Sequence, residues 1–146
     1  MDNRENIKIF IGSGEASLVE RKTLIYSLHK HTKRKLDIYV FNGTHNALEH
    51  NQDEPVLAPL PLKLKYLNGS TEFSLYRYLI PQICQYRGKA IYLDADIVCL
   101  ADIGELWDAE LKEVDLLALA NAFPELGQGL YRTSVTLMNC ESWRLD

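Results

Sequence analysis

The chain has 146 residues, of which 47% are hydrophobic and 25% are charged, and its formal net charge is -4 at pH 7. This composition is typical of a globular protein, fits one domain over residues 1–146, and excludes a disordered or fibrous chain. There is no basic block to favour a nucleic-acid partner, and no apolar run approaches the roughly 20 residues of a membrane span. Residues 1–6 are polar and unlike a signal peptide, so we expect a cytoplasmic protein.

The first apolar run, residues 7–11, predicts a strand. The run leads into Gly12, Ser13 and Gly14, where small residues would let the backbone approach a ligand closely; an ordinary turn from strand to helix explains them equally well. Ser17 and Glu20 have the spacing of a capping box, which predicts the start of a helix. The apolar face of that helix is expected to consist of Leu18, Val19, Leu24, Ile25 and Leu28.

Apolar runs continue to alternate with polar segments along the rest of the chain. The further expected strands are residues 36–41, 62–66, 90–93, 116–120 and 131–138, with long loops at 42–54 and 121–129. Helices are expected after Ser70 and after Asp102, and Pro81 should kink the first of them or end its first half. Strands and helices in alternation predict an α/β domain with a mainly parallel sheet.

The most informative segment is Asp94, Ala95 and Asp96, which follows the apolar run 90–93 directly. Buried parallel strands place functional groups just beyond their carboxyl ends. If the extended geometry continued through Asp96, both carboxylates would face the same side and could bind one hard cation. The simpler alternative is that the two carboxylates belong to a turn that caps the next element.

Two neighbouring carboxylates at a strand end repel each other, so they require open solvent or a cation. Ligation by oxygen alone favours manganese, magnesium or calcium over zinc. With only two carboxylates from the protein, water and phosphate oxygens would complete the coordination. The segment therefore predicts a divalent metal that bridges Asp94 and Asp96 to a diphosphate ligand.

Three stretches together resemble glycosyltransferases of family 8, which share the Rossmann-like GT-A fold for nucleotide-diphospho-sugars. The first is Ile-Phe-Ile-Gly at 9–12 with its following helix, and the second is the segment 69–81 that contains Arg77. The third is Ile-Tyr-Leu-Asp-Ala-Asp-Ile-Val at 91–98, with Asp-Ile-Gly-Glu-Leu-Trp at 102–107. An Asp-x-Asp motif alone would be weak, and the order and spacing of the three stretches make the resemblance specific.

The resemblance implies a retaining hexosyltransferase that moves a sugar from a nucleotide diphosphate, expected to be uridine diphosphate, to an acceptor hydroxyl. The donor would lie against Gly12, Ser13 and Gly14, with Mn2+ (or Mg2+) held by Asp94 and Asp96. Asp94 would also contact the ribose, and Ala95 lies within the same donor-binding segment. Arg77 would lie across the sugar-phosphate, although by itself it would be read as a surface arginine paired with Glu72. The resemblance does not identify a catalytic residue.

The chain departs from the family pattern in three places. Many relatives carry an acidic residue where Gly14 stands, so only the neighbouring Glu15 could replace it. Residues 131–135 read Tyr-Arg-Thr-Ser-Val where relatives often read Phe-Asn-Ser-Gly-Val. The resemblance also covers only about the first half of a family domain and lacks a carboxyl-terminal histidine ligand. We therefore expect a truncated domain, whose sheet could promote oligomerisation.

Two alternatives to a glycosyltransferase remain at this point. Asp-x-Asp after an apolar strand also opens phosphatases of the haloacid dehalogenase type, in which the first aspartate is a nucleophile. In those enzymes the motif usually begins the domain, whereas here it lies deep in the chain. The other alternative is a non-catalytic remnant that binds a nucleotide sugar and transfers nothing.

Overall fold

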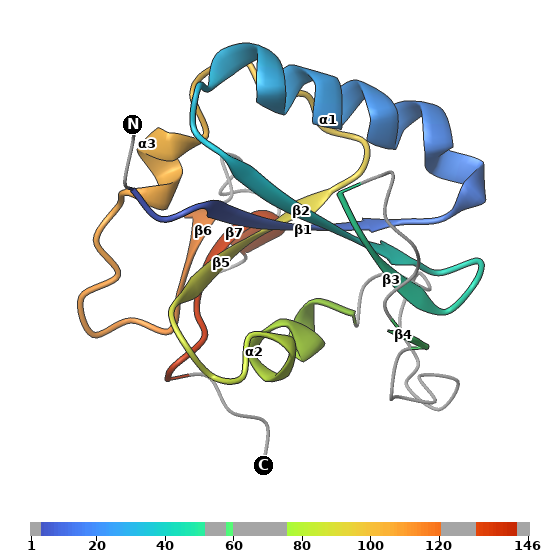
Figure 1. Ribbon diagram of the computed structural model, residues 1–146. Coiled ribbons are helices and arrows are strands. Elements are labelled where there is room, and N and C mark those ends of the chain that lie inside the picture. The colour runs from blue at the N-terminus through green and yellow to red at the C-terminus, as the bar shows by residue number, and fades with distance from the viewer. Residues whose placement is uncertain (1–3, 52–57, 60–75, 121–130, 143–146) are drawn as a thin grey trace, which may run out of the picture.

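The computed structural model of the protein describes residues 4–51, 58–59, 76–120 and 131–142. In chain order, with η for a 3-10 helix, the elements are β1 (Ile7–Ser13), η1 (Glu15–Ser17), α1 (Leu18–His31), β2 (Leu36–Asn42), β3 (Ala47–His50), β4 (Ala58–Pro59), η3 (Tyr76–Leu79), α2 (Ile80–Ile83), β5 (Lys89–Asp94), α3 (Gly104–Trp107), β6 (Leu116–Ala120) and β7 (Tyr131–Asn139). The strands form one sheet, with α1 and α3 on one face and α2 on the other (Figure 1). The predicted α/β class is confirmed. No helix in these ranges is long and apolar enough to cross a membrane.

Within the described residues the sheet has seven strands, in the order β4-β3-β2-β1-β5-β7-β6. Its centre is parallel, because β1 pairs in parallel with both β2 and β5. The flanking pairs are antiparallel: β3 with β2, β4 with β3, β7 with β5, and β6 with β7. The expectation of a mainly parallel sheet therefore holds for the centre alone, and the sheet as a whole is mixed. A short connection such as the one from β2 to β3 permits only a hairpin, since a parallel crossover needs a much longer chain.

Strand β3 lies inside the segment 42–54 that the sequence predicts to be a loop. Its four residues pair with β2 from Tyr39↔His50 to Asn42↔Ala47. Two of the four, Ala47 and Leu48, are buried, while Glu49 and His50 are half-buried. The prediction of a loop is wrong here because the strand carries only two apolar residues.

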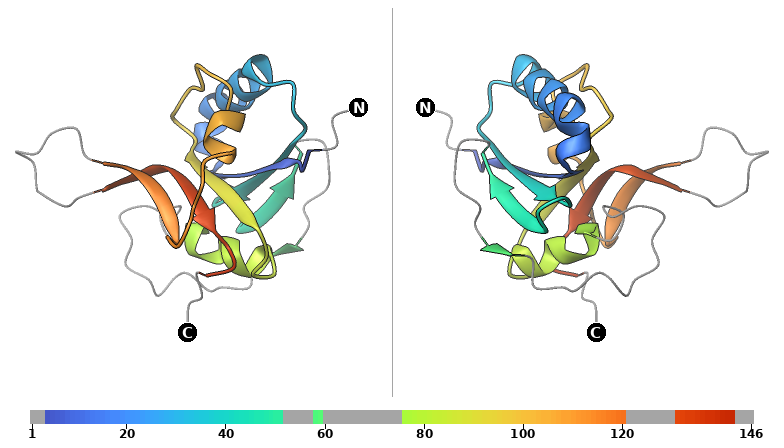
Figure 2. Two further views of the ribbon diagram at one scale, coloured as in Figure 1. Left: turned by 90° about the vertical axis from the view of Figure 1, so that its left-hand side faces the viewer. Right: turned by 90° about the vertical axis from the view of Figure 1, so that its right-hand side faces the viewer.

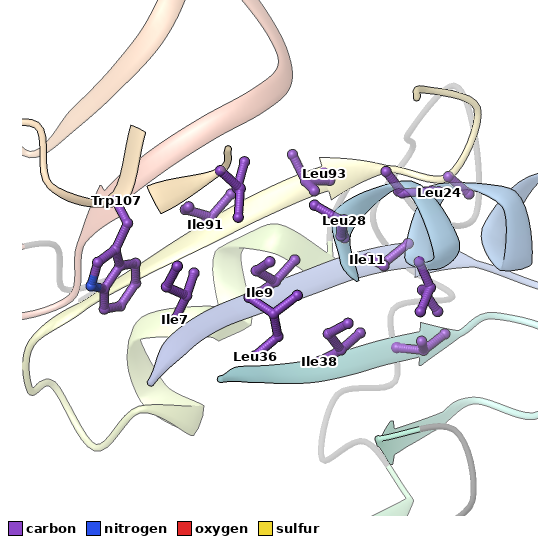
Figure 3. Packing of buried hydrophobic residues seen from close by; sticks show 14 of the residues in the cluster. Ile7, Ile9, Ile11, Leu24, Leu28, Leu36, Ile38, Ile91, Leu93 and Trp107 are labelled. Atoms are coloured by element: carbon purple, nitrogen blue, oxygen red, sulfur yellow. The ribbon is translucent and has the colours of Figure 1, made fainter. Parts of the chain in front are cut away.

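The face of the sheet under α1 and α3 buries aliphatic side chains (Figure 3). Alternate residues of the central strands point to this side, as the period of two requires. The cluster includes Ile7, Ile9, Ile11, Ile91, Leu93, Leu24, Leu28 and Trp107. Leu24, Ile25 and Leu28 of α1 are buried as predicted, whereas Val19 is 74% exposed and does not belong to the apolar face.

The opposite face, under α2, is lined by aromatic side chains. Phe10 stacks on Phe41 with ring centroids 5.5 Å apart, and Phe41 stacks on Tyr76 at the same distance. Ile80 of α2 and Tyr92 of β5 are buried in the same cluster. Figure 2 shows α2 below the sheet from both sides. This packing fixes η3, and therefore Arg77, against the central strands.

One local prediction needs correction. Ser17 precedes α1, but its hydroxyl makes no capping hydrogen bond with that helix; it pairs with the Ser13 hydroxyl at 2.8 Å instead. Pro81 lies in the first turn of α2, directly after η3 ends at Leu79, so the helical segment changes type at the place where Pro81 was expected to interrupt it. The expected strand at 62–66, the helix start near Ser70 and the loop at 121–129 lie outside the described residues.

Candidate functional site

The carboxyl ends of the two central parallel strands, β1 and β5, meet at one edge of the sheet. Gly12 of β1 is the register partner of Asp94 of β5. Gly12 and Ser13 still belong to β1, so only Gly14 lies outside the strand, and the predicted three-residue loop is shorter than expected. In an open α/β sheet this edge is where ligands bind. The structure therefore brings Gly12 and Asp94 together at the edge where a donor would be expected.

Strand β5 ends at Asp94, and Ala95 and Asp96 form a turn. The extended geometry does not continue through Asp96. Ala95 is only 7% exposed and belongs to the core under α1, while Asp94 is half-buried and Asp96 is exposed. The buried alanine thus lies between two accessible carboxylates in a turn, and the extended geometry that was expected to direct both to the same side is not present.

Tyr92 lies two residues before Asp94, and its side chain is buried on the α2 face of the sheet. Its hydroxyl donates a hydrogen bond to Oδ1 of Asp94 at 3.0 Å. Burial raises the pKa of the Tyr92 phenol, and the nearby negative charge of Asp94 raises it further. The phenol is therefore a constant hydrogen-bond donor to the carboxylate.

Arg77 reaches the same place from η3. Its guanidinium carbon lies 4.8 Å from the ring centroid of Tyr92. Its Nη1 donates to the backbone oxygen of Thr133 at 3.1 Å and also contacts the Thr133 hydroxyl. The predicted residues Arg77 and Asp94 thus meet at one tyrosine ring, and β7 supplies the second support for Arg77. Sequence reasoning did not identify Tyr92 as the side chain that joins them.

Ser13 faces the other side of the sheet. It is fully buried, and its hydroxyl accepts a hydrogen bond from Nη1 of Arg21 at 2.9 Å. The same Arg21 nitrogen lies 3.3 Å from the carbonyl oxygen of Gly14. The side chain of Ser13 is therefore committed to α1, and Arg21 fixes the end of β1. Arg21 precedes Leu24 by three residues, and this spacing could have revealed that it lies on the buried face.

Glu15, the residue next to Gly14, is held by polar side chains on the β2 side. Nδ2 of Asn42 donates to Oε1 of Glu15 at 2.9 Å, and Nε2 of His45 lies 3.5 Å from the same oxygen. The hydrogen bond from Asn42 lowers the pKa of Glu15, and the positive charge of Arg21 lowers it further. The exposed Glu15 is thus a fixed anion beside the end of β1.

Within the described ranges, no three side chains of Asp, Glu, His or Cys converge as a metal centre would require. The candidate ligands are thus the two carboxylates of Asp94 and Asp96. This donor set consists of oxygen alone, which fits Mn2+ or Mg2+ and leaves most coordination positions to water or phosphate.

A cavity of about 330 Å³ lies on the α1 side of the sheet, away from the side chains of Tyr92 and Arg77. Its lining is mostly apolar and includes Leu24, Leu28, Leu93, Ile97, Leu106 and Val135. A mostly apolar lining does not suit a charged diphosphate, so the cavity is not part of the candidate donor site.

The sequence comparisons point to one family of glycosyltransferases. The sequence model of "Glycosyl transferase family 8" matches residues 9–134. Glycosyltransferase GlyB of Streptococcus pneumoniae serotype 4 is 33% identical over 89 residues, which is 61% of this chain and 21% of GlyB. Protein CDI of Arabidopsis thaliana is 51% identical over 39 residues, which is 27% of this chain and 15% of that protein.

Solved structures show the same fold. The glycosyltransferase GlyE of Streptococcus pneumoniae TIGR4 matches with a TM-score of 0.64 and 23% identity, over 94% of this chain and 35% of GlyE. The galactosyltransferase LgtC, in complex with donor and acceptor sugar analogs, matches with a TM-score of 0.69 and 17% identity, over 94% of this chain and 59% of LgtC. The chain therefore has the GT-A fold and spans only part of the length of these relatives. By its sequence match over residues 9–134, the chain belongs to glycosyl transferase family 8.

Proposed function

We propose that this chain forms the donor-binding part of a retaining hexosyltransferase that uses a nucleotide diphosphate sugar, with uridine diphosphate as the leaving group. The observation that carries the proposal is the meeting of Arg77 and Asp94 at Tyr92, beside Gly12, at the carboxyl edge of β1 and β5. A cation and an anion held at this edge match the two needs of a diphosphate, which are a fixed positive charge and a metal ligand.

In this proposal Asp94 and Asp96 hold Mn2+ or Mg2+, and Gly12 and Gly14 leave room for the nucleotide. The metal, when bound, supplies positive charge that stabilises the departing diphosphate. Arg77 adds a fixed guanidinium on the same side, because it is held over Tyr92 and by Thr133. Ser13 contributes through its buried contact with Arg21, which fixes the backbone at the end of β1.

The test is calorimetric titration of the purified chain with uridine diphosphate, with and without Mn2+. We expect binding that requires Mn2+ and is lost in the Asp96→Asn variant, because an amide is a weaker metal ligand than a carboxylate. Asp115→Asn is the matched control, since Asp115 is an exposed aspartate that precedes β6. Absence of binding in the wild-type protein, or equal binding in Asp96→Asn, would contradict the proposal.

The alternative is a remnant that binds the donor without transferring sugar, because this chain covers only 21% of GlyB and 35% of GlyE. Release of uridine diphosphate from a panel of uridine diphosphate hexoses distinguishes the two. Turnover that disappears in Asp96→Asn supports a transferase, and Mn2+-dependent binding without turnover supports the remnant. Family membership argues against the phosphatase alternative, for which hydrolysis of p-nitrophenyl phosphate is the direct check.

A further inference from the structure

Tyr92 occupies a fixed position in the centre of the sheet. Its backbone pairs with Phe10 of β1 on one side and with Thr136 of β7 on the other. The side chain is fully buried. Because residues two apart in a strand face the same side, the side chains of Tyr92 and Asp94 are neighbours on one face of the sheet. Tyr92 is therefore a rigid partner for the two side chains that contact it, Asp94 and Arg77.

The Tyr92 hydroxyl determines where the Asp94 carboxylate lies. A buried phenol requires a hydrogen-bond partner, and here the partner is Oδ1 of Asp94 at 3.0 Å. A carboxylate oxygen can accept more than one interaction, so the other oxygen and the remaining lone pairs of Asp94 stay available to a cation. The hydrogen bond thus restricts the rotation of the carboxylate and leaves the Oδ2 atom to bind a cation.

The Tyr92 ring determines where the Arg77 guanidinium lies. The guanidinium carbon is 4.8 Å from the ring centroid, within the range of a cation–π interaction. The same guanidinium also donates to the backbone of Thr133, which fixes its orientation in the plane. One side chain therefore carries an anion at its hydroxyl and a cation over its ring.

We propose that Tyr92 is a positioning residue that holds Asp94 and Arg77 in a fixed relation, so that the metal and the diphosphate of one donor meet both. This inference rests on the proposed donor site. The hydroxyl acts through Asp94 and hence on metal binding, and the ring acts through Arg77 and hence on diphosphate binding. These two effects can be separated experimentally.

The test compares Tyr92→Phe with Tyr92→Leu in the full chain, using uridine diphosphate and Mn2+ as probes. Tyr92→Phe keeps the ring and the packing, so we expect the Mn2+ concentration for half-maximal binding to rise about tenfold, the usual effect of losing one hydrogen bond to a charged group. At saturating Mn2+ its affinity for uridine diphosphate should return to within about twofold of wild type. Tyr92→Leu should lose affinity even at saturating Mn2+, because Arg77 loses its support.

The control is Tyr39→Phe, which removes a phenol from the adjacent region of the same aromatic face, where Tyr39 stacks on Phe10. We expect it to bind like the wild type. Circular dichroism and thermal unfolding establish that Tyr92→Phe is folded. An unchanged Mn2+ requirement in Tyr92→Phe would overturn the role of Tyr92 while leaving the donor site intact. Failure of the wild-type protein to bind would overturn the donor site, and the role of Tyr92 with it.

Discussion

Arg77 differs from a simple positive charge because its planar guanidinium makes two kinds of contact at once. It lies over the Tyr92 ring and donates in its plane to Thr133. A lysine ammonium keeps the charge but cannot make both contacts in this geometry. We therefore expect Arg77→Lys to weaken Mn2+-dependent binding of uridine diphosphate by about tenfold in calorimetry. Arg87→Lys, at an exposed position after α2, is the control, and equal affinities in the two variants would contradict the assignment.

Glu15 gives a prediction about acid stability. The hydrogen bond from Asn42 and the charge of Arg21 lower the pKa of Glu15 from its usual value of 4.5. A lowered folded-state pKa means that the ionised form stabilises the fold above about pH 4.5, and that this contribution is lost as the pH falls through the folded-state value. We expect Glu15→Gln to lose less stability than wild type when urea unfolding is compared at neutral pH and at pH 3. An equal loss would show that Glu15 has no part in the acid response.

At the level of single residues, the sequence suggests as candidates those side chains whose chemistry is visible in a short motif. Asp94 and Asp96 follow an apolar strand, and both Arg77 and Asp94 contact Tyr92. The role of Tyr92 depends on its contact with Arg77, which lies in another element, so no local pattern reports it. The buried position of Arg21, in contrast, is visible in its spacing from Leu24. From the sequence alone Tyr92 is an ordinary core residue, and only the structure shows that the Arg77 guanidinium lies over its ring.

Helix α1 shows how a helix can be assigned correctly while its buried face is partly wrong. Val19 was expected on the apolar face but is 74% exposed, whereas Leu28 is fully buried against the sheet. We expect Leu28→Ala to lower the free energy of unfolding by about 2 to 5 kcal/mol, because it leaves a cavity in the core. Val19→Ala should change it by about 0.5 kcal/mol or less. Urea denaturation measures both, and comparable losses would contradict the assigned face.

The elements that the sequence predicted best are those with long apolar runs. Strands β1, β2, β5, β6 and β7 lie within two residues of their expected bounds. Strand β3 was missed because its short sequence is half polar and lies in a polar segment. The capping box at Ser17 failed because the Ser17 hydroxyl pairs instead with the hydroxyl of Ser13, four residues earlier at the end of β1.

At the scale of the molecule, the two core clusters of the described residues lie on opposite faces of the sheet and consist of hydrophobic side chains, whereas Asp94 is half-buried and Asp96 is exposed. The fold should therefore not depend on the metal. We expect a chelator to leave the melting temperature and the far-ultraviolet circular dichroism unchanged, and uridine diphosphate with Mn2+ to raise the melting temperature by ligand linkage. A large loss of structure on chelation would show that the metal has a structural role. Asp96→Asn is the control, in which the ligand-induced rise should disappear.

The layered α/β arrangement was predictable from the alternation of apolar segments, but the mixed character of the sheet was not. Strand direction depends on the connections, and β7 pairs with β5 although the two strands are far apart in the chain. The parallel centre is the part that places Gly12 beside Asp94. The sequence therefore predicted the parallel centre of the sheet, where the candidate site lies, but not the antiparallel pairing of its outer strands.

The pairing of Gly12 with Asp94 also bears on how the protein is made. The two residues are distant in the chain, so closing this contact has a large entropic cost and tends to slow folding. During synthesis, β1 can pair with β2 early, but its other side has no partner until β5 leaves the ribosome. Until β5 is synthesised, this edge of β1 is unpaired, and at that stage aggregation competes with productive folding.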